Sequence, residues 1–193
     1  MSQNKPTRYI FPVGELKYIH VVRADDKFNP QNPDYNVTMV YPAAEGKRIV
    51  ADLEQLVPTF KGRIPFKRDN DDNYIFKAKQ RSRIEFKDRD TGEPTVIYFK
   101  PVLKFEGKDY EGAEPWGGST GEVATQLAIT KVQGRDTLTI RLKGIRFHDI
   151  KIGDGSSEGD DGNDDLFAGN FESGAPKAAP VVIEAEDDDV PFN

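Results

Sequence analysis

The sequence predicts a mainly β protein: a small closed or partly closed barrel with one helix and extended hairpins, followed by a disordered acidic tail. Three observations support this prediction. Several segments rich in β-branched and aromatic residues alternate between polar and apolar positions. A single segment has the spacing of an amphipathic helix. The C-terminal end is acidic and contains few apolar residues.

The first half of the chain contains two predicted strands and the helix. Residues 17–23 and 36–41 are strand-like, and the turn-forming residues of 29–34 separate them. The segment 43–57 is the predicted helix, because its apolar residues recur at helical spacing and Pro58 ends it. The residues expected on its buried face are Ile49, Leu53, Leu56 and Val57.

The second half contains two predicted hairpins. These are 73–87 with 95–105, and 122–132 with 136–150. A Gly- and Pro-rich loop, 106–121, connects them. In the last strand Gly144 interrupts the side-chain alternation, which predicts a bulge or a sharp bend.

One face of the segment 73–87 is a row of cations. Residues two apart share a face of a strand at a spacing of about 6.6–6.8 Å, and the even positions here are mostly core-like. The odd positions carry four consecutive cations, Lys77, Lys79, Arg81 and Arg83. Such a row repels itself. A polyanion such as single-stranded nucleic acid explains it better than an ordinary solvated face, on which the two signs of charge are mixed.

The other predicted strands add aromatic and basic residues to this pattern. Tyr98 shares a strand face with Lys100, and Arg141 points away from the core side of the last strand. Bases stack on aromatic rings whatever their identity, while basic residues follow the phosphates. The single tryptophan, Trp116, lies in the Gly-rich loop, where it either stacks on a base or caps one end of the barrel.

Catalytic chemistry has little support. The Gly-rich stretch 117–121 lacks the Gly-Lys-Ser/Thr ending of a phosphate-binding loop. The carboxylates of Asp69, Asp71 and Asp72 indicate a solvated turn before a strand rather than a Mg²⁺ site. The chain has no cysteine and two histidines, neither with a catalytic partner nearby in sequence. We therefore expect no enzymatic activity, no metal and no cofactor.

Composition also bears on the compartment. No segment approaches the roughly 18 apolar residues of a membrane span, and the first residues lack the apolar region of a secretory signal. The absence of cysteine agrees with a reducing environment. We expect a soluble cytoplasmic protein without a membrane partner.

The net charge of −6 conceals two oppositely charged parts. Residues 153–193 contain 12 of the 33 acidic residues and one basic residue, a net charge of −11, whereas residues 1–152 carry +5. A Gly-, Ser- and Asp-rich segment buries too little apolar surface to offset its ordering entropy. The prediction is a folded domain over 1–152 and a disordered tail over 153–193. The end of the tail is either a short interaction motif or part of a solubilising segment.

The last residues and two body segments resemble known families. Asp187, Asp188, Asp189, Val190, Pro191 and Phe192 resemble the acidic tip of bacterial single-stranded DNA-binding proteins, which end in Asp-Asp-Asp-Ile-Pro-Phe. Here Asn193 follows the phenylalanine. The body resembles the phage single-stranded DNA-binding proteins of the T7 type through residues 34–42 and 117–123. That resemblance implies an OB-fold-like barrel with one helix, followed by an acidic tail.

The resemblance implies a non-catalytic, sequence-tolerant binder of single-stranded DNA in phage replication, recombination or repair, located in the host cytoplasm. The residues expected to follow phosphates are Lys77, Lys79, Arg81, Arg83, Lys100 and Arg141, and those expected to stack on bases are Tyr98 and Trp116. The tail would modulate DNA binding and recruit replication or recombination proteins through residues 187–192. Two alternatives stay open: an RNA-binding OB module, and a recombination-mediator or protein-interaction adaptor.

Overall fold

The computed structural model describes residues 7–27, 29–87 and 92–153. The elements of this part of the chain are, in order, β1 (Thr7–Asp25), β2 (Asp34–Tyr41), α1 (Ala43–Leu56), β3 (Lys67–Arg68), β4 (Tyr74–Arg81), β5 (Arg83–Lys87), β6 (Pro94–Tyr98), β7 (Val102–Phe105), β8 (Lys108–Asp109), β9 (Ser119–Val132) and β10 (Arg135–Asp149). No helix in these ranges is both long and apolar enough to cross a membrane. The predicted tail lies outside the described residues, apart from Gly153.

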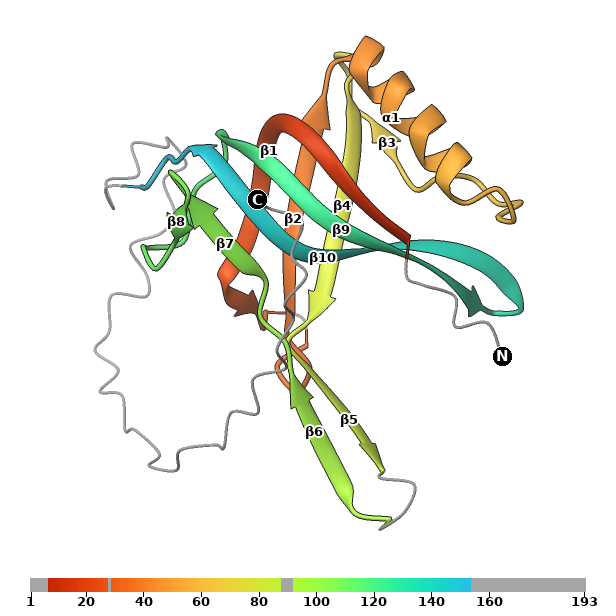
Figure 1. The fold of residues 1–193 in the computed structure, drawn as a ribbon, viewed down its shortest axis with the longest axis vertical. Coiled ribbons are helices and arrows are strands. Elements are labelled where there is room, and N and C mark those ends of the chain that lie inside the picture. Colours follow the sequence, from red (N-terminus) through yellow and green to blue (C-terminus); the bar gives the residue numbers. More distant parts are fainter. Residues whose placement is uncertain (1–6, 28, 88–91, 154–193) are drawn as a thin grey trace, which may run out of the picture.

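Five strands close into a barrel. The hydrogen-bonded order is β1, β2, β4, β10 and β9, and β9 pairs again with β1. Neighbouring strands are antiparallel except at the seam between β4 and β10, where the strands are parallel and Arg141 lies opposite Lys79. Figure 1 shows these strands curving around a common interior. The predicted small barrel of OB-fold type is confirmed.

The remaining strands extend the barrel at its margins. β3 adds to β4, whereas β7 pairs in parallel with the second half of β10 and carries β8 on its outer edge. β5 and β6 form a separate two-stranded sheet that projects away from the barrel (Figure 1). This projecting hairpin leaves several apolar side chains partly exposed, namely Ile84, Phe86, Val96 and Ile97.

Aromatic rings fill the barrel interior. Phe11, Tyr41 and Phe76, from three different strands, pack with ring centroids 5.3 to 6.4 Å apart. The Tyr41 hydroxyl donates a hydrogen bond to the Pro12 carbonyl at 2.7 Å, so its polar end is satisfied. The backbone of Gly14 lies against the same ring and leaves no room for a Cβ. The rings of three neighbouring strands thus pack against one another in the barrel interior.

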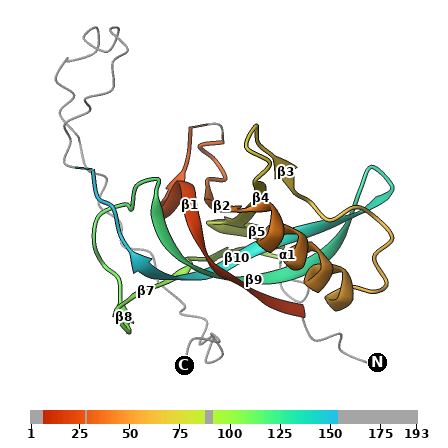
Figure 2. The same ribbon diagram turned by 90° about the horizontal axis from the view of Figure 1, so that it is seen from above.

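The predicted helix is confirmed within one residue at its C-terminal end. α1 lies beside the barrel (Figure 2) and buries Ile49 and Leu53 against it, and Val57 is buried just beyond the last turn. The prediction was wrong for Leu56, which is 40% exposed. Leu56 is the last helical residue, and Val57 fills the core at this end in its place.

The segment 73–87 is two strands rather than one. β4 ends at Arg81, where its last pair with β2 is Asp34 opposite Arg81. Beyond this point β2 offers no partner, so Ser82 bends the chain and donates its N–H to the Pro33 carbonyl at 2.9 Å. β5 then pairs only with β6, and the predicted core position Phe86 is 42% exposed.

Other boundaries differ for similar reasons. β1 begins ten residues earlier than predicted, because its first half pairs with β9, which is distant in sequence. The segment 95–105 splits into β6, which pairs with β5, and β7, which pairs with β10. The last hairpin is confirmed: Gln133 and Gly134 both have positive φ, as its tight turn requires. The bulge at Gly144 is also confirmed by a register shift between Leu142 and Gly144.

Candidate nucleic-acid interface

The outer face of β4 carries exposed cations over a polar floor. Lys77 and Lys79 are exposed, and their cross-strand neighbours on β2 are Thr38 and Asn36. Both β2 residues face away from the core, since Val37 between them is buried in it. They are nevertheless only 7% and 4% exposed. The surface between the lysines is therefore close-packed and polar, with the ammonium groups standing at its border.

The barrel seam brings together two of the predicted residues. Lys79 and Arg141 are direct neighbours across the parallel β4–β10 pair, so both side chains lie on the outer face. They come from segments about 60 residues apart in the chain. The same row continues around the barrel, with Gln126 opposite Arg141 and Arg8 opposite Gln126. We call the surface formed by Lys77, Lys79 and Arg141 the cationic face.

Electrostatic crowding is evident on the cationic face. Partial burial lowers the pKa of Lys77 below its ordinary 10.5, and the positive charges of Lys79 and Lys67 lower it further. The acidic residues Asp25 and Asp34 act in the opposite direction. Like charges held at this distance disfavour the folded state. Lys77, Lys79 and Arg141 nevertheless stand beside one another on the outer face, and such an arrangement is suited to a polyanion.

The other predicted cations are more dispersed. Arg81 is exposed and has an acidic residue, Asp34, as its cross-strand neighbour on β2. Arg83 is half-buried at the base of the projecting hairpin, and its Nε is buried with no hydrogen-bond partner among the described residues. Tyr98 lies opposite Arg83 and is 61% exposed. Lys100 is exposed in the short connection between β6 and β7.

The Gly-rich loop is held against the edge of β1. The Glu114 carboxylate accepts hydrogen bonds from three consecutive backbone N–H groups, those of Val21, Val22 and Arg23. Further along the loop, the Trp116 N–H donates to the Lys151 carbonyl at 2.7 Å, and the indole packs against the backbone of Gly153. Trp116 remains 53% exposed, so the structure allows both the base-stacking and the end-capping interpretation.

Sequence reasoning missed Lys17 and Tyr18. Both face outward on β1 beside the loop, and Tyr18 is the most exposed large hydrophobic side chain in the described part of the chain, at 71%. A β-bulge disrupts the alternation of β1 at this point, and such a bulge has no signature in the sequence. The only signal in the sequence was the strand-like segment 17–23 itself, which contains a lysine followed by a tyrosine.

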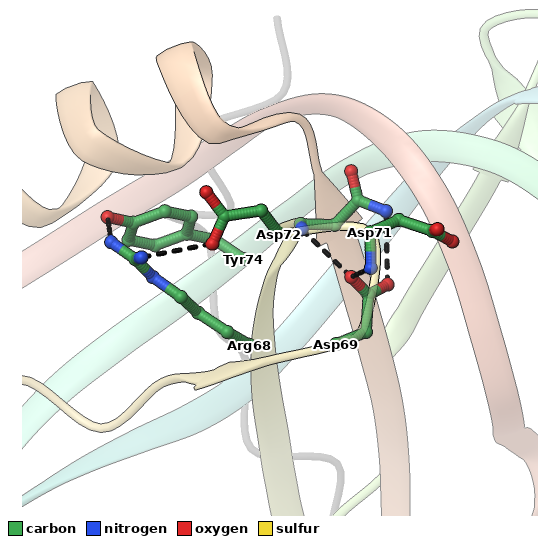
Figure 3. Close-up of polar contacts among 6 residues, drawn as sticks. Arg68, Asp69, Asp71, Asp72 and Tyr74 are labelled. Carbon is green, nitrogen blue, oxygen red and sulfur yellow. Dashed lines mark hydrogen bonds and ion pairs between the residues drawn. The ribbon is translucent and has the colours of Figure 1, made fainter.

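The acidic cluster before β4 is a hydrogen-bonded turn (Figure 3). Asp69 accepts hydrogen bonds from the backbone N–H groups of Asp71 and Asn73, and from the Asn73 side chain. These bonds, the Asn73 side chain foremost, lower the pKa of the Asp69 carboxyl. Asp72 pairs instead with Arg68, 3.0 Å away, whose guanidinium lies over the Tyr74 ring. In the described ranges, no group of three or more His, Cys, Asp or Glu residues could hold a metal ion.

Comparison with known proteins identifies the fold. No protein-family description and no curated protein sequence matches the chain. The solved structure of gp2.5, a single-stranded DNA-binding protein encoded by bacteriophage T7, superposes with a TM-score of 0.59 at 18% identity, covering 88% of this chain and 100% of that one. The chain has the fold of phage single-stranded DNA-binding proteins. This confirms the T7-type body that the sequence resemblance predicted.

A second phage protein shows the same likeness. The single-stranded DNA-binding protein from bacteriophage Enc34, solved in complex with single-stranded DNA, superposes with a TM-score of 0.57 at 11% identity. This match covers 77% of the chain and 90% of the Enc34 protein. At such identities the likeness concerns the fold alone.

Proposed function

We propose that this protein is a non-catalytic, sequence-tolerant binder of single-stranded DNA. The observation that carries the proposal is the cationic face of Lys77, Lys79 and Arg141 on the outside of an OB-type barrel. The strands 2–3 face of such barrels is a common oligonucleotide site. Here those two strands are β2 and β4, the strands that hold Lys77, Lys79 and the polar floor.

The spacing of these cations suits a phosphate backbone. Lys77 and Lys79 are two residues apart on one strand, about 6.6–6.8 Å, and Arg141 is one strand away, about 4.7–4.9 Å. Cations at such intervals neutralise successive phosphates and release condensed counterions. Phosphate contacts carry no base information, so we expect affinity without sequence preference. Arg81, Arg83 and Lys100 extend the positive charge toward the projecting hairpin.

The exposed aromatic residues supply the second component. Tyr98 on β6 and Trp116 in the loop are each more than half exposed. Stacking of a base on an aromatic ring contributes roughly 1–3 kcal/mol, whatever the base. In our proposal these rings hold bases while the lysines and arginines hold phosphates.

The biological setting is part of the same proposal. We infer a role in phage DNA replication, recombination or repair, with residues 1–152 as the DNA-binding domain and 153–193 as an acidic tail. The charges of +5 and −11 support an exchange in which the tail occupies the cationic face until DNA displaces it. The released tip, residues 187–192, would then recruit a replication or recombination protein.

A titration of intrinsic fluorescence tests the proposal. The single tryptophan, Trp116, reports binding of oligo-dT at several salt concentrations. If roughly four to six phosphates are neutralised, the slope of log K against log salt is about −3 to −4. A slope near zero, or equal affinity for duplex DNA, contradicts the proposal. Tighter binding of poly-U than of poly-dT would indicate an RNA-binding module, and loss of affinity in the isolated domain would indicate a tail-dependent adaptor.

A further inference from the structure

The bulge in β1 presents two neighbouring side chains on the same face. Lys17 lies opposite Thr38, but His20, three residues later, lies opposite Asn36, only two residues away on β2. The extra residue on β1 breaks the alternation. Leu16 and Ile19 are buried, so Lys17 and Tyr18 between them both point outward. A cation and an aromatic ring thus stand side by side.

The backbone of Tyr18 is strained, and no burial of its ring accounts for the strain. Its φ is +48°, a left-handed value that is uncommon for bulky non-glycine residues. The Tyr18 ring is 71% exposed, so packing against the core does not offset this strain. Sparsely populated backbone conformations of this kind concentrate at ligand-binding sites. Tyr18 is therefore a candidate contact residue on conformational grounds as well as chemical ones.

A pocket opens beside this ring. It has a volume of about 580 Å³ and is lined by Glu15, Lys17, Tyr18, Gly117, Gly118 and Lys151. The hollow is open to solvent, so a base can approach the Tyr18 ring from outside. A Cβ at Gly117 would meet no neighbouring atom, so the loop leaves this side of the pocket open. The lining residues supply the aromatic ring of Tyr18, the ammonium groups of Lys17 and Lys151, and glycine backbone without side chains.

Backbone hydrogen bonds hold the loop beside β1. The Gly118 N–H donates to the Leu16 carbonyl at 2.9 Å, which ties the loop to β1 next to the bulge. The backbone N–H of Trp116 donates a hydrogen bond to the Lys151 carbonyl, which ties the loop to the segment after β10. Lys17 also forms an exposed ion pair with Glu15 at 3.5 Å. Exposed pairs are weak, so a phosphate can take the place of this carboxylate.

The pocket is continuous with the cationic face. Lys17, Thr38 and Lys77 form one row across β1, β2 and β4, because Thr38 is the register partner of both lysines. Neighbouring strands are about 4.7–4.9 Å apart, which puts the two lysines roughly 10 Å from each other. A strand of DNA that leaves Lys77 across β2 therefore reaches Lys17 and the pocket within two nucleotides or so.

We propose that this pocket is a nucleotide subsite of the single-stranded DNA path. Tyr18 stacks on one base, and Lys17 and Lys151 hold the flanking phosphates. The inference rests on the proposed function and extends it to a named aromatic residue that the sequence pattern did not reveal. It also sets the direction of the path, across the strands from the β4–β10 seam toward the loop 116–118.

Tyr18→Gly is the informative variant, because glycine adopts the left-handed conformation without strain. In the full chain we expect oligo-dT binding to weaken by roughly 5- to 150-fold, with an unchanged salt slope and no lower melting temperature. Tyr18→Phe keeps the ring and should bind within about twofold of the wild type. On a fully abasic oligonucleotide, Tyr18→Gly and wild type should bind equally.

The controls separate this inference from the proposed function. Lys17→Gln and Lys151→Gln should each reduce the magnitude of the salt slope by about 0.7. If the wild type binds oligo-dT with a steep salt dependence but Tyr18→Gly binds as tightly, the subsite is wrong and the proposed function stands. An equal loss on abasic DNA, with a lower melting temperature, would show a structural role only and also overturn the subsite. Failure of the wild type to bind would overturn the proposed function itself.

Discussion

Lys77 is the residue at which binding and stability are most clearly opposed. Its pKa in the folded protein lies below 10.5, because of burial first and neighbouring cations second. The unfolded chain therefore binds more protons at alkaline pH, and the free energy of unfolding should rise with pH as it approaches 10.5. At neutral pH the charged lysine reduces stability, which is consistent with a side chain retained for a ligand.

Replacing Lys77 should separate these two effects. Lys77→Gln removes the charge, so we expect the melting temperature at pH 7 to stay equal or rise, and the alkaline gain in stability to shrink. Loss of one phosphate contact should weaken oligo-dT binding about fivefold at about 0.1 M salt. Thermal denaturation over pH 7–11 and fluorescence titration measure the two effects. A lower melting temperature with unchanged affinity would contradict this account.

The same face supports a matched pair of substitutions. Lys79→Ala and Arg81→Ala should both weaken binding to all sequences alike, because phosphates carry no base information. The effect should be larger for Lys79, which neighbours Arg141, than for Arg81, which lies opposite Asp34. Both side chains are exposed, so the domain should stay folded. Full affinity in the double variant would show that DNA uses another face.

At the scale of elements, one side chain fastens the loop before β9 to the edge of β1. Glu114 accepts three backbone hydrogen bonds from residues 21–23 of β1, beyond the point where β1 pairs with β9. An edge strand left with free N–H groups is otherwise open to water or to another chain. The carboxylate therefore holds the loop, and with it Trp116 and the pocket, against the barrel.

Glu114→Gln should loosen this attachment. The amide keeps one acceptor oxygen but loses the charge, so we expect a loss of about 1 kcal/mol and a melting temperature lower by about 2–4 °C. Hydrogen exchange should show faster exchange at the amides of residues 21–23, with β9–β10 unaffected. Unchanged protection at these amides would mean that β1 is held by other contacts.

The projecting hairpin is an element of a different kind. β5 and β6 pair only with each other, and an isolated two-stranded sheet is marginal in water. We expect its amides to exchange faster than those of β4, which has β2, β3 and β10 as neighbours. If Arg83 and Tyr98 contact DNA, saturating oligo-dT should slow this exchange. No change with DNA would exclude the hairpin from the interface.

For the molecule as a whole, the opposed charges of domain and tail dominate. In the proposed function about 30 residues join the tip, residues 187–192, to the domain, and such a tether gives an effective concentration that can reach the millimolar range. In this proposal the carboxylates of the tip occupy the cationic face at low salt, with Phe192 in the place of a base. Binding of DNA and exposure of the tip would be linked, so that partner recruitment follows DNA coating.

Deletion of the tail tests this competition. The deletion should begin at Asp154, because the backbone of Gly153 packs against the Trp116 indole. We expect single-stranded DNA binding to tighten several-fold at low salt and the gain to shrink at high salt, where the tail is screened as well. If the affinity for single-stranded DNA stays equal or falls after truncation, the competition is wrong and the tail is a docking or solubilising segment.

Local sequence was sufficient for much of the architecture. The helix, the last hairpin, the bulge at Gly144 and the division of charge all depend on residues close together in the chain. Helical spacing, turn chemistry and side-chain alternation act over short ranges, so they can be recognised without the fold. The barrel-like strand pattern and the segments 34–42 and 117–123 also sufficed to indicate the T7-type fold.

Short-range sequence patterns could not predict which strands pair with one another. Whether the segment 73–87 continues straight or bends at Ser82 depends on where β2, far away in sequence, stops offering hydrogen bonds. The side-by-side position of Lys79 and Arg141 exists only because the barrel closes between β4 and β10. Tyr18 faces outward only because one extra residue on β1 has to be accommodated against β2. Each of these features is a matter of register between distant strands, and register is set by the closed barrel as a whole, not by any segment of it.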